Sequence, residues 1–177
     1  MNLPNTLSLV RIFLVPVLMV FLIVIPRPHN LSAVSVFLAA VLTDWLDGRI
    51  ARSTRQVTTL GKLLDPVADK LLISASLISL VQVGRVKAWM VVLIVGRDLA
   101  ITGLRAIAAS QNVIIQASDF GKATMIAEVV AVALLILNWS AIFIPLGKAV
   151  LVVAILLSLA SGVAYFRKFW RSIDLMK

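Results

Sequence analysis

Long apolar runs, broken at short intervals by turn-forming residues, dominate the hydrophobicity pattern of this 177-residue chain. Each run holds 18 to 24 residues, close to the length that a helix needs to cross about 30 Å of hydrocarbon. The breaks fall at residues such as Pro26, Gly84 and the pair Pro145/Gly147. The pattern predicts an all-α fold, an integral membrane bundle of six transmembrane helices: Leu7–Ile25, Leu31–Arg52, Leu60–Val83, Ala88–Ser110, Gly121–Asn138 and Gly147–Phe166.

Composition supports a membrane protein made of one domain, residues 1–177. The chain is 61% hydrophobic with a mean hydropathy of +1.05, more apolar than an ordinary soluble domain. It has no cysteine and one histidine, His29, which excludes thiolate chemistry and leaves acid–base work mainly to carboxylates. The first apolar run has no basic segment before it, so we expect a membrane span and not a signal peptide.

Basic residues predict the orientation of the bundle. The formal charge of +9 suits nucleic acid or an anionic membrane, and the hydrophobicity favours the membrane, with no nucleic-acid partner. Two basic clusters fall on the same side of a six-span chain, which predicts that both termini and the region 44–70 face the cytoplasm. They are Arg49, Arg52, Arg55 and Lys62, and in the tail Arg167, Lys168, Arg171 and Lys177.

Half of the acidic residues gather in one short segment. Of eight, four lie within 26 positions, where the second predicted helix ends and the third begins: Asp44, Asp47, Asp65 and Asp69. Helical spacing puts each pair on one face of its helix. If the two faces oppose each other, four carboxylates share a small volume and repel one another unless divalent cations neutralise them. All-oxygen ligands indicate Mg²⁺ or Mn²⁺.

Small residues accompany these aspartates. Gly48, Ala51 and Gly61 would let a bulky ligand approach the helix backbone. Three other interpretations of the acidic segment stay open: solvated helix caps paired with nearby basic residues, an aspartate-rich prenyltransferase, and a small cation transporter.

The acidic segment resembles a family signature. It is similar to the pattern DxxDGxxAR, eight residues, GxxxDxxxD of the CDP-alcohol phosphatidyltransferases, with every fixed position present: Asp44, Asp47, Gly48, Ala51, Arg52, Gly61, Asp65 and Asp69. The segments Leu3–Arg11, Gly96–Arg105 and Gly121-Lys122 resemble parts of the bacterial phosphatidylglycerophosphate synthases within that family.

The resemblance implies an activity and a set of site residues. It implies transfer of a phosphatidyl group from CDP-diacylglycerol to glycerol-3-phosphate, by a homodimer that uses two divalent cations, Mg²⁺ or Mn²⁺. One cation would bind Asp44, Asp47 and Asp65, and the other Asp44, Asp65 and Asp69, with Asp69 also the general base. The CDP group would lie against Asn5, Asp44, Asp47, Gly48, Ala51, Arg52 and Gly61.

Three basic residues in apolar surroundings predict the acceptor site. Arg97 and Arg105 lie eight residues apart in one apolar run, and Lys122 opens the next. A charge at membrane depth costs at least about 2.5–3.5 kcal/mol, so we expect these side chains to bind an anion, the phosphate of glycerol-3-phosphate. Alternatively, Arg97 pairs with the adjacent Asp98 and Arg105 extends to the membrane interface.

Two positions depart from the resemblance. Thr124 stands where the family often has a second lysine, and Glu128 where glutamine is common. The acceptor therefore stays open: phosphatidylglycerol, as in cardiolipin synthases, and inositol phosphate are the alternatives within the same superfamily.

Overall fold

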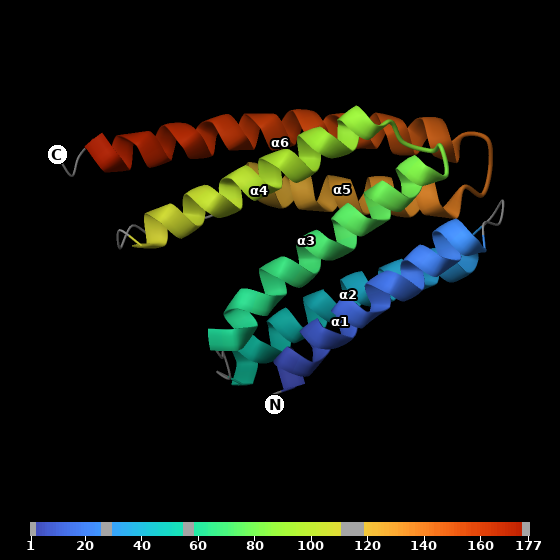
Figure 1. Cartoon of the computed structure of the whole chain (residues 1–177), viewed down its shortest axis with the longest axis horizontal. Coiled ribbons are helices and arrows are strands. Elements are labelled where there is room, and N and C mark those ends of the chain that lie inside the picture. Colours follow the sequence, from blue (N-terminus) through green and yellow to red (C-terminus); the bar gives the residue numbers. More distant parts are fainter. Residues whose placement is uncertain (1–2, 26–29, 55–58, 111–118, 175–177) are drawn as a thin grey trace.

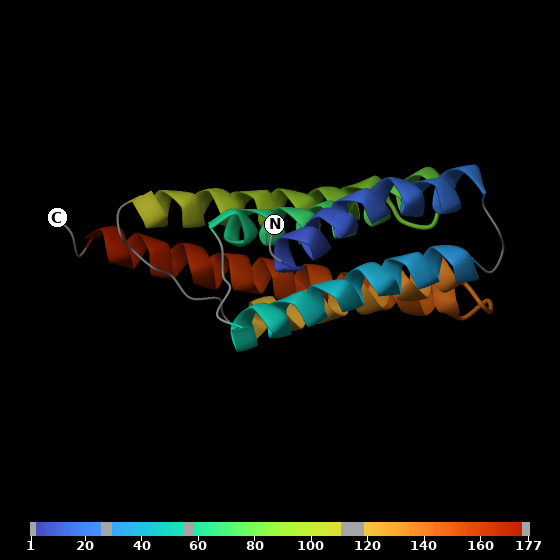
Figure 2. The same ribbon diagram turned by 90° about the horizontal axis from the view of Figure 1, so that it is seen from below.

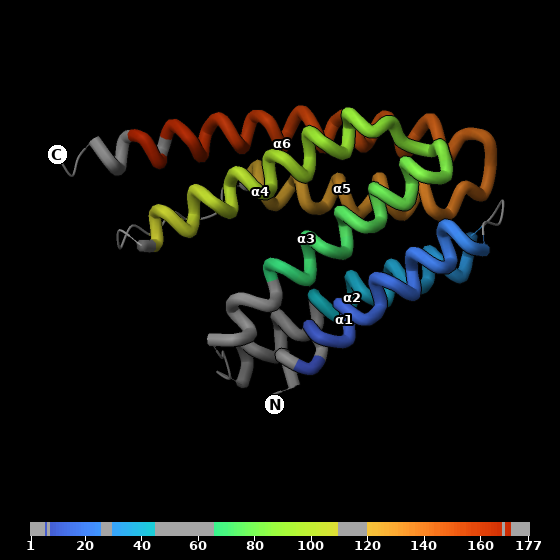
Figure 3. Tube along the Cα trace, in the orientation of Figure 1, coloured from blue at the N-terminus to red at the C-terminus, as the bar shows by residue number. Residues whose placement is uncertain are grey.

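The computed structural model describes the backbone of residues 3–25, 30–54, 59–110 and 119–174 (Figure 3). Within those ranges, side chains are described except at residues 3–5, 7, 45–54, 59–65, 110, 119, 168 and 171–174. The described residues form six α-helices: α1 (Leu3–Met19), α2 (Leu31–Thr54), α3 (Thr59–Gln82), α4 (Ala88–Ser110), α5 (Asp119–Leu137) and α6 (Phe143–Asp174). A π-helical turn, η1 (Val20–Val24), continues α1. The predicted all-α fold with six helices is confirmed.

Consecutive helices run antiparallel and form two layers. Figure 2 shows α1, α3 and α4 in one layer and α2, α5 and α6 in the other. The alternation brings the start of α1, α3 and α5 and the end of α2, α4 and α6 toward the same end of the bundle (Figure 1). Helix α5 packs most extensively on α6, and α1 packs against both α2 and α3. Side chains of α1 are therefore in a position to reach both helices of the acidic segment.

The ends of two helices differ clearly from the predicted spans. Helix α1 begins at Leu3 and not at Leu7, and α6 runs from Phe143 to Asp174 where Gly147–Phe166 was predicted, so that it includes Pro145. Proline is tolerated there because the first turn of a helix needs no intrahelical N–H donors. Gly147 has a packing role, since a Cβ added there would lie 2.7 Å from the side chain of Leu135 on α5.

Short connections are fixed by specific hydrogen bonds. Before α2, the side chain of Asn30 accepts from the backbone N–H of Ala33 (3.1 Å) and donates to the carbonyl of Phe21 (2.7 Å), which caps α2 and ties it to η1. After α3, Gly84 adopts a φ of +73°. The backbone N–H of Gly84 donates to Val81 and that of Arg85 to Leu80, the Schellman arrangement that favours glycine at this position.

Arg85 then joins this turn to the far end of α5. Its Nη1 donates to the carbonyls of Leu135 (2.7 Å) and Ile136 (2.9 Å). Those carbonyls lie in the last turn of α5, where no further residue of the helix can pair with them. A guanidinium is well suited to this end of a helix because the helix dipole is negative there.

Apolar side chains fill the bundle and also cover its outer surface. The buried core draws on all six helices, with Leu18, Phe37, Leu77, Ile94, Leu135 and Leu151 among its members. Large exposed apolar side chains occur on every helix as well, including Phe13, Leu42, Ile78, Val92, Ile126 and Leu156. So much exposed apolar surface is unusual for a soluble monomer and is typical of contact with lipid or another protein.

Two of the described helices are long and apolar enough to cross a bilayer, over Phe120–Leu137 in α5 and Phe143–Arg167 in α6. Shorter apolar stretches occupy Ser8–Val24 and Leu31–Asp44. The prediction of six helices is thus confirmed, whereas the prediction that all six cross the membrane stays a prediction.

Candidate active site

A buried arginine of α1 lies between two carboxylates of the acidic segment. Nη1 of Arg11 is 2.9 Å from Oδ1 of Asp44 on α2 and 2.7 Å from Oδ1 of Asp69 on α3. Its Nε donates to the carbonyl of Ala40 (3.3 Å). The side chain of Arg11 is fully buried, while those of Asp44 and Asp69 are 26% and 32% exposed. The two carboxylates therefore converge on one cation and keep a partly open side.

The other residues predicted for the metal and CDP sites are placed only by their backbone. Asp47, Gly48, Ala51 and Arg52 lie in α2, and Asn5, Gly61 and Asp65 lie in α1 and α3. Their side chains fall outside the described part of the chain. Among the side chains that are described, no three acidic, histidine or cysteine residues gather around one point. The convergence of all four aspartates therefore remains a prediction.

Asp44 and Asp69 fit a divalent cation in the chemistry of their donor atoms. Both offer carboxylate oxygens, the ligands that Mg²⁺ and Mn²⁺ prefer. They come from two different helices and share one positively charged neighbour, Nη1 of Arg11. Two acids that already share one cation lie close enough to repel each other, so additional positive charge on their open side would be stabilising.

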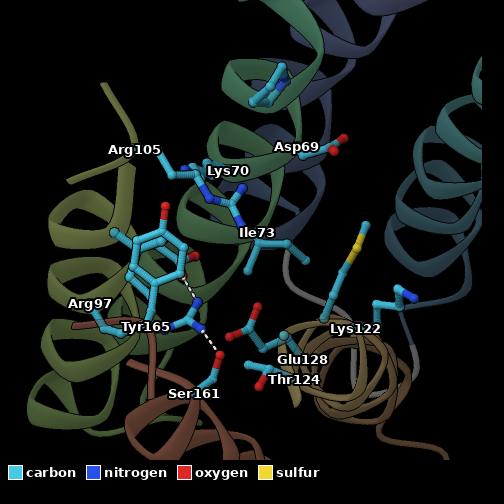
Figure 4. A pocket seen from close by; sticks show the side chains of 15 residues that line it. Asp69, Lys70, Ile73, Arg97, Arg105, Lys122, Thr124, Glu128, Ser161 and Tyr165 are labelled. Atoms are coloured by element: carbon cyan, nitrogen blue, oxygen red, sulfur yellow. Dashed lines mark hydrogen bonds and ion pairs between the residues drawn. The ribbon is translucent and has the colours of Figure 1, made fainter. Parts of the chain in front are cut away.

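A cavity of about 310 Å³ adjoins this ion pair, within the size range of small-molecule sites. Its walls come from α3, α4, α5 and α6 (Figure 4). The charged and polar side chains that line it are Asp69, Lys70, Arg97, Asp98, Arg105, Lys122, Thr124, Glu128, Ser161 and Tyr165. Asp69 belongs to both places: it pairs with Arg11 and lines the cavity.

Arg97 lines this cavity and joins α4 to α6. Its Nη1 donates to Asp98 (2.7 Å), Nη2 to the hydroxyl of Ser161 (2.9 Å) and Nε to the carbonyl of Ser158 (3.1 Å). The alternative that Arg97 pairs with its neighbour Asp98 is therefore confirmed. A guanidinium has five N–H donors, so these three bonds still leave Arg97 able to contact a ligand.

Three more cations face the same cavity. Arg105 lies over the ring of Tyr165, 5.5 Å from its centre, a cation–π contact that fixes the guanidinium against α6. Lys122 lines the cavity from the first turn of α5. Lys70 does so from α3, and its ammonium donates to the hydroxyl of Thr102 on α4. The three predicted acceptor residues thus line one cavity, with Lys70 as an addition.

Thr124 stands where the family often has a lysine, and it adds no positive charge to this group of cations. Its hydroxyl donates to the carbonyl of Phe120, one turn earlier in α5 (2.8 Å), so its hydrogen-bonding capacity is directed to its own helix. The absence of a lysine at this position thus leaves Lys70, Arg97, Arg105 and Lys122 as the cations of the cavity.

Two buried polar atoms on the cavity wall have no partner among the described residues. They are Oε1 of Glu128 and the hydroxyl of Tyr165, on side chains that are 5% and 6% exposed. A buried polar group without a hydrogen bond costs about 1–3 kcal/mol. Groups of this kind at a cavity wall are typical of sites that a ligand completes.

With this geometry in view, comparison with known proteins decides the family. The sequence matches the CDP-alcohol phosphatidyltransferases over residues 1–160. The chain belongs to that family. It is therefore a phosphatidyltransferase, and the resemblance carried by the signature from Asp44 to Asp69 is confirmed.

Relatives of this CDP-alcohol phosphatidyltransferase match it along nearly its full length. The CDP-diacylglycerol–glycerol-3-phosphate 3-phosphatidyltransferase of Bacillus subtilis is 38% identical to this chain, and the matched region covers 97% of each of the two chains. A second enzyme with that name, from Arabidopsis thaliana, is 36% identical over 96% of this chain and 80% of its own. A probable phosphatidylglycerophosphate synthase of Mycobacterium tuberculosis is also 36% identical, over 97% of this chain and 83% of its own.

Sequence reasoning missed four residues of this candidate site: Arg11, Lys70, Ser161 and Tyr165. A signal for Arg11 was present, because it stands between Val10 and Ile12 in an apolar run, the same kind of placement that singled out Arg97. Lys70 follows directly after Asp69 and, by sequence, is one of the nearby basic residues that could pair with the aspartates. Ser161 and Tyr165 are ordinary helix residues by sequence, and only the packing of α6 on α4 brings them to the cavity.

Proposed function

We propose that this protein transfers the phosphatidyl group of CDP-diacylglycerol to glycerol-3-phosphate, giving phosphatidylglycerophosphate and CMP. The observation that carries the proposal is the position of Asp69, which joins the carboxylates of the signature to a cavity lined with four cations. A phosphorylated acceptor bound there would present its hydroxyl near a carboxylate. The names of the relatives from Bacillus subtilis and Arabidopsis thaliana describe this same reaction.

In the proposed mechanism, the acidic segment holds the activated donor. Asp44, Asp47, Asp65 and Asp69 would bind two divalent cations, which supply positive charge to the diphosphate of CDP-diacylglycerol. The small residues Gly48, Ala51 and Gly61 would leave room for the nucleotide beside the helices. Asn5 and Arg52 would contact its diphosphate, as the family resemblance implies.

Asp69 then serves as the general base of a direct displacement. Its carboxylate takes the proton of the acceptor hydroxyl, whose oxygen forms a new bond to the lipid-side phosphorus while the bond from that phosphorus to CMP breaks. Arg11 keeps the Asp69 carboxylate in place through their 2.7 Å contact. The chain has no cysteine and no histidine near the signature, so a covalent enzyme intermediate on those groups is excluded.

The acceptor phosphate is assigned to the cations of the cavity. Arg105 and Lys122 face it from α4 and α5, and Arg97 contributes the N–H groups that its three structural bonds leave over. Two or more cations suit the dianion of a phosphate monoester. Phosphatidylglycerol, by contrast, presents a phosphodiester with a single negative charge, which needs fewer of these cations.

We further propose that all six helices cross a bilayer, with the catalytic end of the bundle toward the cytoplasm. Arg49 and Arg52 near the end of α2, and Lys62 near the start of α3, place basic residues at this end of the bundle. This asymmetry agrees with the excess of basic residues found on the cytoplasmic side of membrane proteins. A homodimer in this membrane is expected from the family resemblance alone.

An acceptor panel tests the proposal. Purified protein with CDP-diacylglycerol and Mg²⁺ would be offered glycerol-3-phosphate, inositol phosphate, serine or phosphatidylglycerol, and CMP release measured for each. We expect release with glycerol-3-phosphate far above the other three. A preference for phosphatidylglycerol or inositol phosphate would assign the chain to another branch of the family. Cation flux into liposomes without CMP release would favour a transporter.

A further inference from the structure

We propose that Glu128 recognises the hydroxyl group of the acceptor that does not react, and so selects a polyol phosphate over a simple hydroxyalkyl phosphate. This inference rests on the proposed function and names a specificity determinant within it. Glu128 lies on α5, is 5% exposed and lines the cavity. Figure 4 shows its carboxylate pointing into the space between α4, α6 and Ile73 of α3.

The described neighbours of Glu128 do not satisfy it. Its Oε1 is buried and accepts no hydrogen bond from any described residue. Arg97, the cation drawn closest to it in Figure 4, directs a donor from each of its nitrogens to Asp98, Ser158 and Ser161 instead. A buried carboxylate oxygen without a donor, on a side chain that lines a cavity, calls for a donor from a ligand in that cavity.

The charges around the cavity indicate which donor this is. Four cationic side chains line it against three acidic ones, Asp69, Asp98 and Glu128. A ligand that carries an ammonium group would add to an existing excess of positive charge, whereas an anionic ligand would balance it. The donor to Glu128 is therefore a hydroxyl on an otherwise anionic molecule.

The acceptor has one functional group for each part of the cavity. Its phosphate meets the cations, its primary hydroxyl meets Asp69, and its secondary hydroxyl remains for Glu128. A site that hydrogen-bonds a substrate hydroxyl discriminates strongly against an analogue without it, because the buried partner is then left unpaired.

The experiment compares two acceptors that differ only in this group. Glycerol-3-phosphate and 3-hydroxypropyl phosphate share the phosphate and the primary hydroxyl, and the second lacks the secondary hydroxyl. We expect the wild-type enzyme to prefer glycerol-3-phosphate by about 10-fold or more in kcat/KM. In Glu128→Met, kcat/KM should fall for glycerol-3-phosphate and stay nearly unchanged for the analogue, so that the preference is lost. Glu128→Gln, which retains an acceptor oxygen, should keep most of it.

Ser158→Ala is the matched control. Ser158 is 1% exposed and its hydroxyl also lacks a described partner, but it does not line the cavity, so its removal should leave the preference intact. Equal use of both acceptors by the wild type would overturn the inference without any variant, and so would an equal loss for both acceptors in Glu128→Met. If the wild type does not use glycerol-3-phosphate at all, the proposed function fails, and this inference fails with it.

Discussion

The guanidinium of Arg11 lies 2.7 Å from the carboxylate of Asp69, a residue 58 positions further along the chain. The same nitrogen contacts Asp44 at 2.9 Å. One side chain of α1 thereby fixes the relative position of two carboxylates that belong to two other helices. Two of the proposed site residues of the signature are thus held by a helix that lies outside the signature.

Loss of this ion pair should be visible in stability before any activity is measured. Arg11→Met would leave two neighbouring carboxylates without their shared cation, at a cost of roughly 1–3 kcal/mol because both are partly exposed to solvent. We expect a lower Tm than wild type in EDTA, and a larger rise on addition of Mn²⁺, since the metal would replace the lost positive charge. Arg11→Lys keeps the charge, and its Tm in EDTA should lie between those of wild type and Arg11→Met. If Arg11→Met has the same Tm as wild type in EDTA, the ion pairs of Arg11 do not stabilise the fold.

Removal of divalent cations should abolish turnover. The proposed metal ligands are all carboxylates, which bind hard cations. We expect CMP release to stop in excess EDTA and to return with Mg²⁺ or Mn²⁺, while circular dichroism shows that the helices persist. Full turnover in a rigorously metal-free preparation would contradict the two-metal site.

Asp69 should be separable from Asp44 by kinetics. If Asp69 is the base, Asp69→Asn lowers kcat by about 10²- to 10⁴-fold, while CDP-diacylglycerol still binds. Asp44→Asn should weaken binding of metal and nucleotide as well, because Asp44 is assigned to both cations. The measurement is turnover together with binding of a CDP-lipid to each variant. Near-normal turnover in Asp69→Asn would remove it from the chemistry.

Arg85 should contribute to stability and not to catalysis. It lies in the turn between α3 and α4, does not line the cavity, and pairs with the last carbonyls of α5. Arg85→Ala would leave both carbonyls without these bonds, at a cost of about 1–3 kcal/mol. We expect a lower Tm with an unchanged KM for both substrates. Lys87→Ala, which removes an exposed positive charge two residues away, should have little effect on either quantity.

The helices and the acidic segment could be predicted from the sequence because both depend on local spacing. Long apolar runs determine where helices form, and residues spaced three or four apart share a face whatever surrounds them. The start of α6 was predicted wrongly because Pro145 marks either a break or a first turn, and the sequence pattern alone does not distinguish the two.

The partners that charged residues find on other helices could not be predicted, because they depend on how distant helices pack. Arg11 meets Asp69 only because α1 packs against both α2 and α3. Tyr165 contacts Arg105 only because α6 packs against α4. The isolated charges themselves were informative, since a charge in an apolar run is costly without a partner. Which residue becomes that partner depends on the tertiary structure.

Arg105 provides the most direct test of the acceptor site. Its guanidinium is held over the ring of Tyr165, 5.5 Å from the ring centre, and lines the cavity that Asp69 borders. Arg105→Ala should raise the KM for glycerol-3-phosphate by about 10- to 100-fold, the equivalent of one lost charge-assisted hydrogen bond or two. The KM for CDP-diacylglycerol should hardly change, because the nucleotide is assigned to α2 and α3. Lysine at this position should restore binding only in part, since an ammonium cannot form the bidentate contact of a guanidinium.

Lys87→Ala removes the same charge far from the cavity and should leave both constants unchanged. If Arg105→Ala and Lys87→Ala have the same small effect, Arg105 serves only to pack α4 against α6, and the acceptor phosphate must bind to Lys122, Lys70 or Arg97.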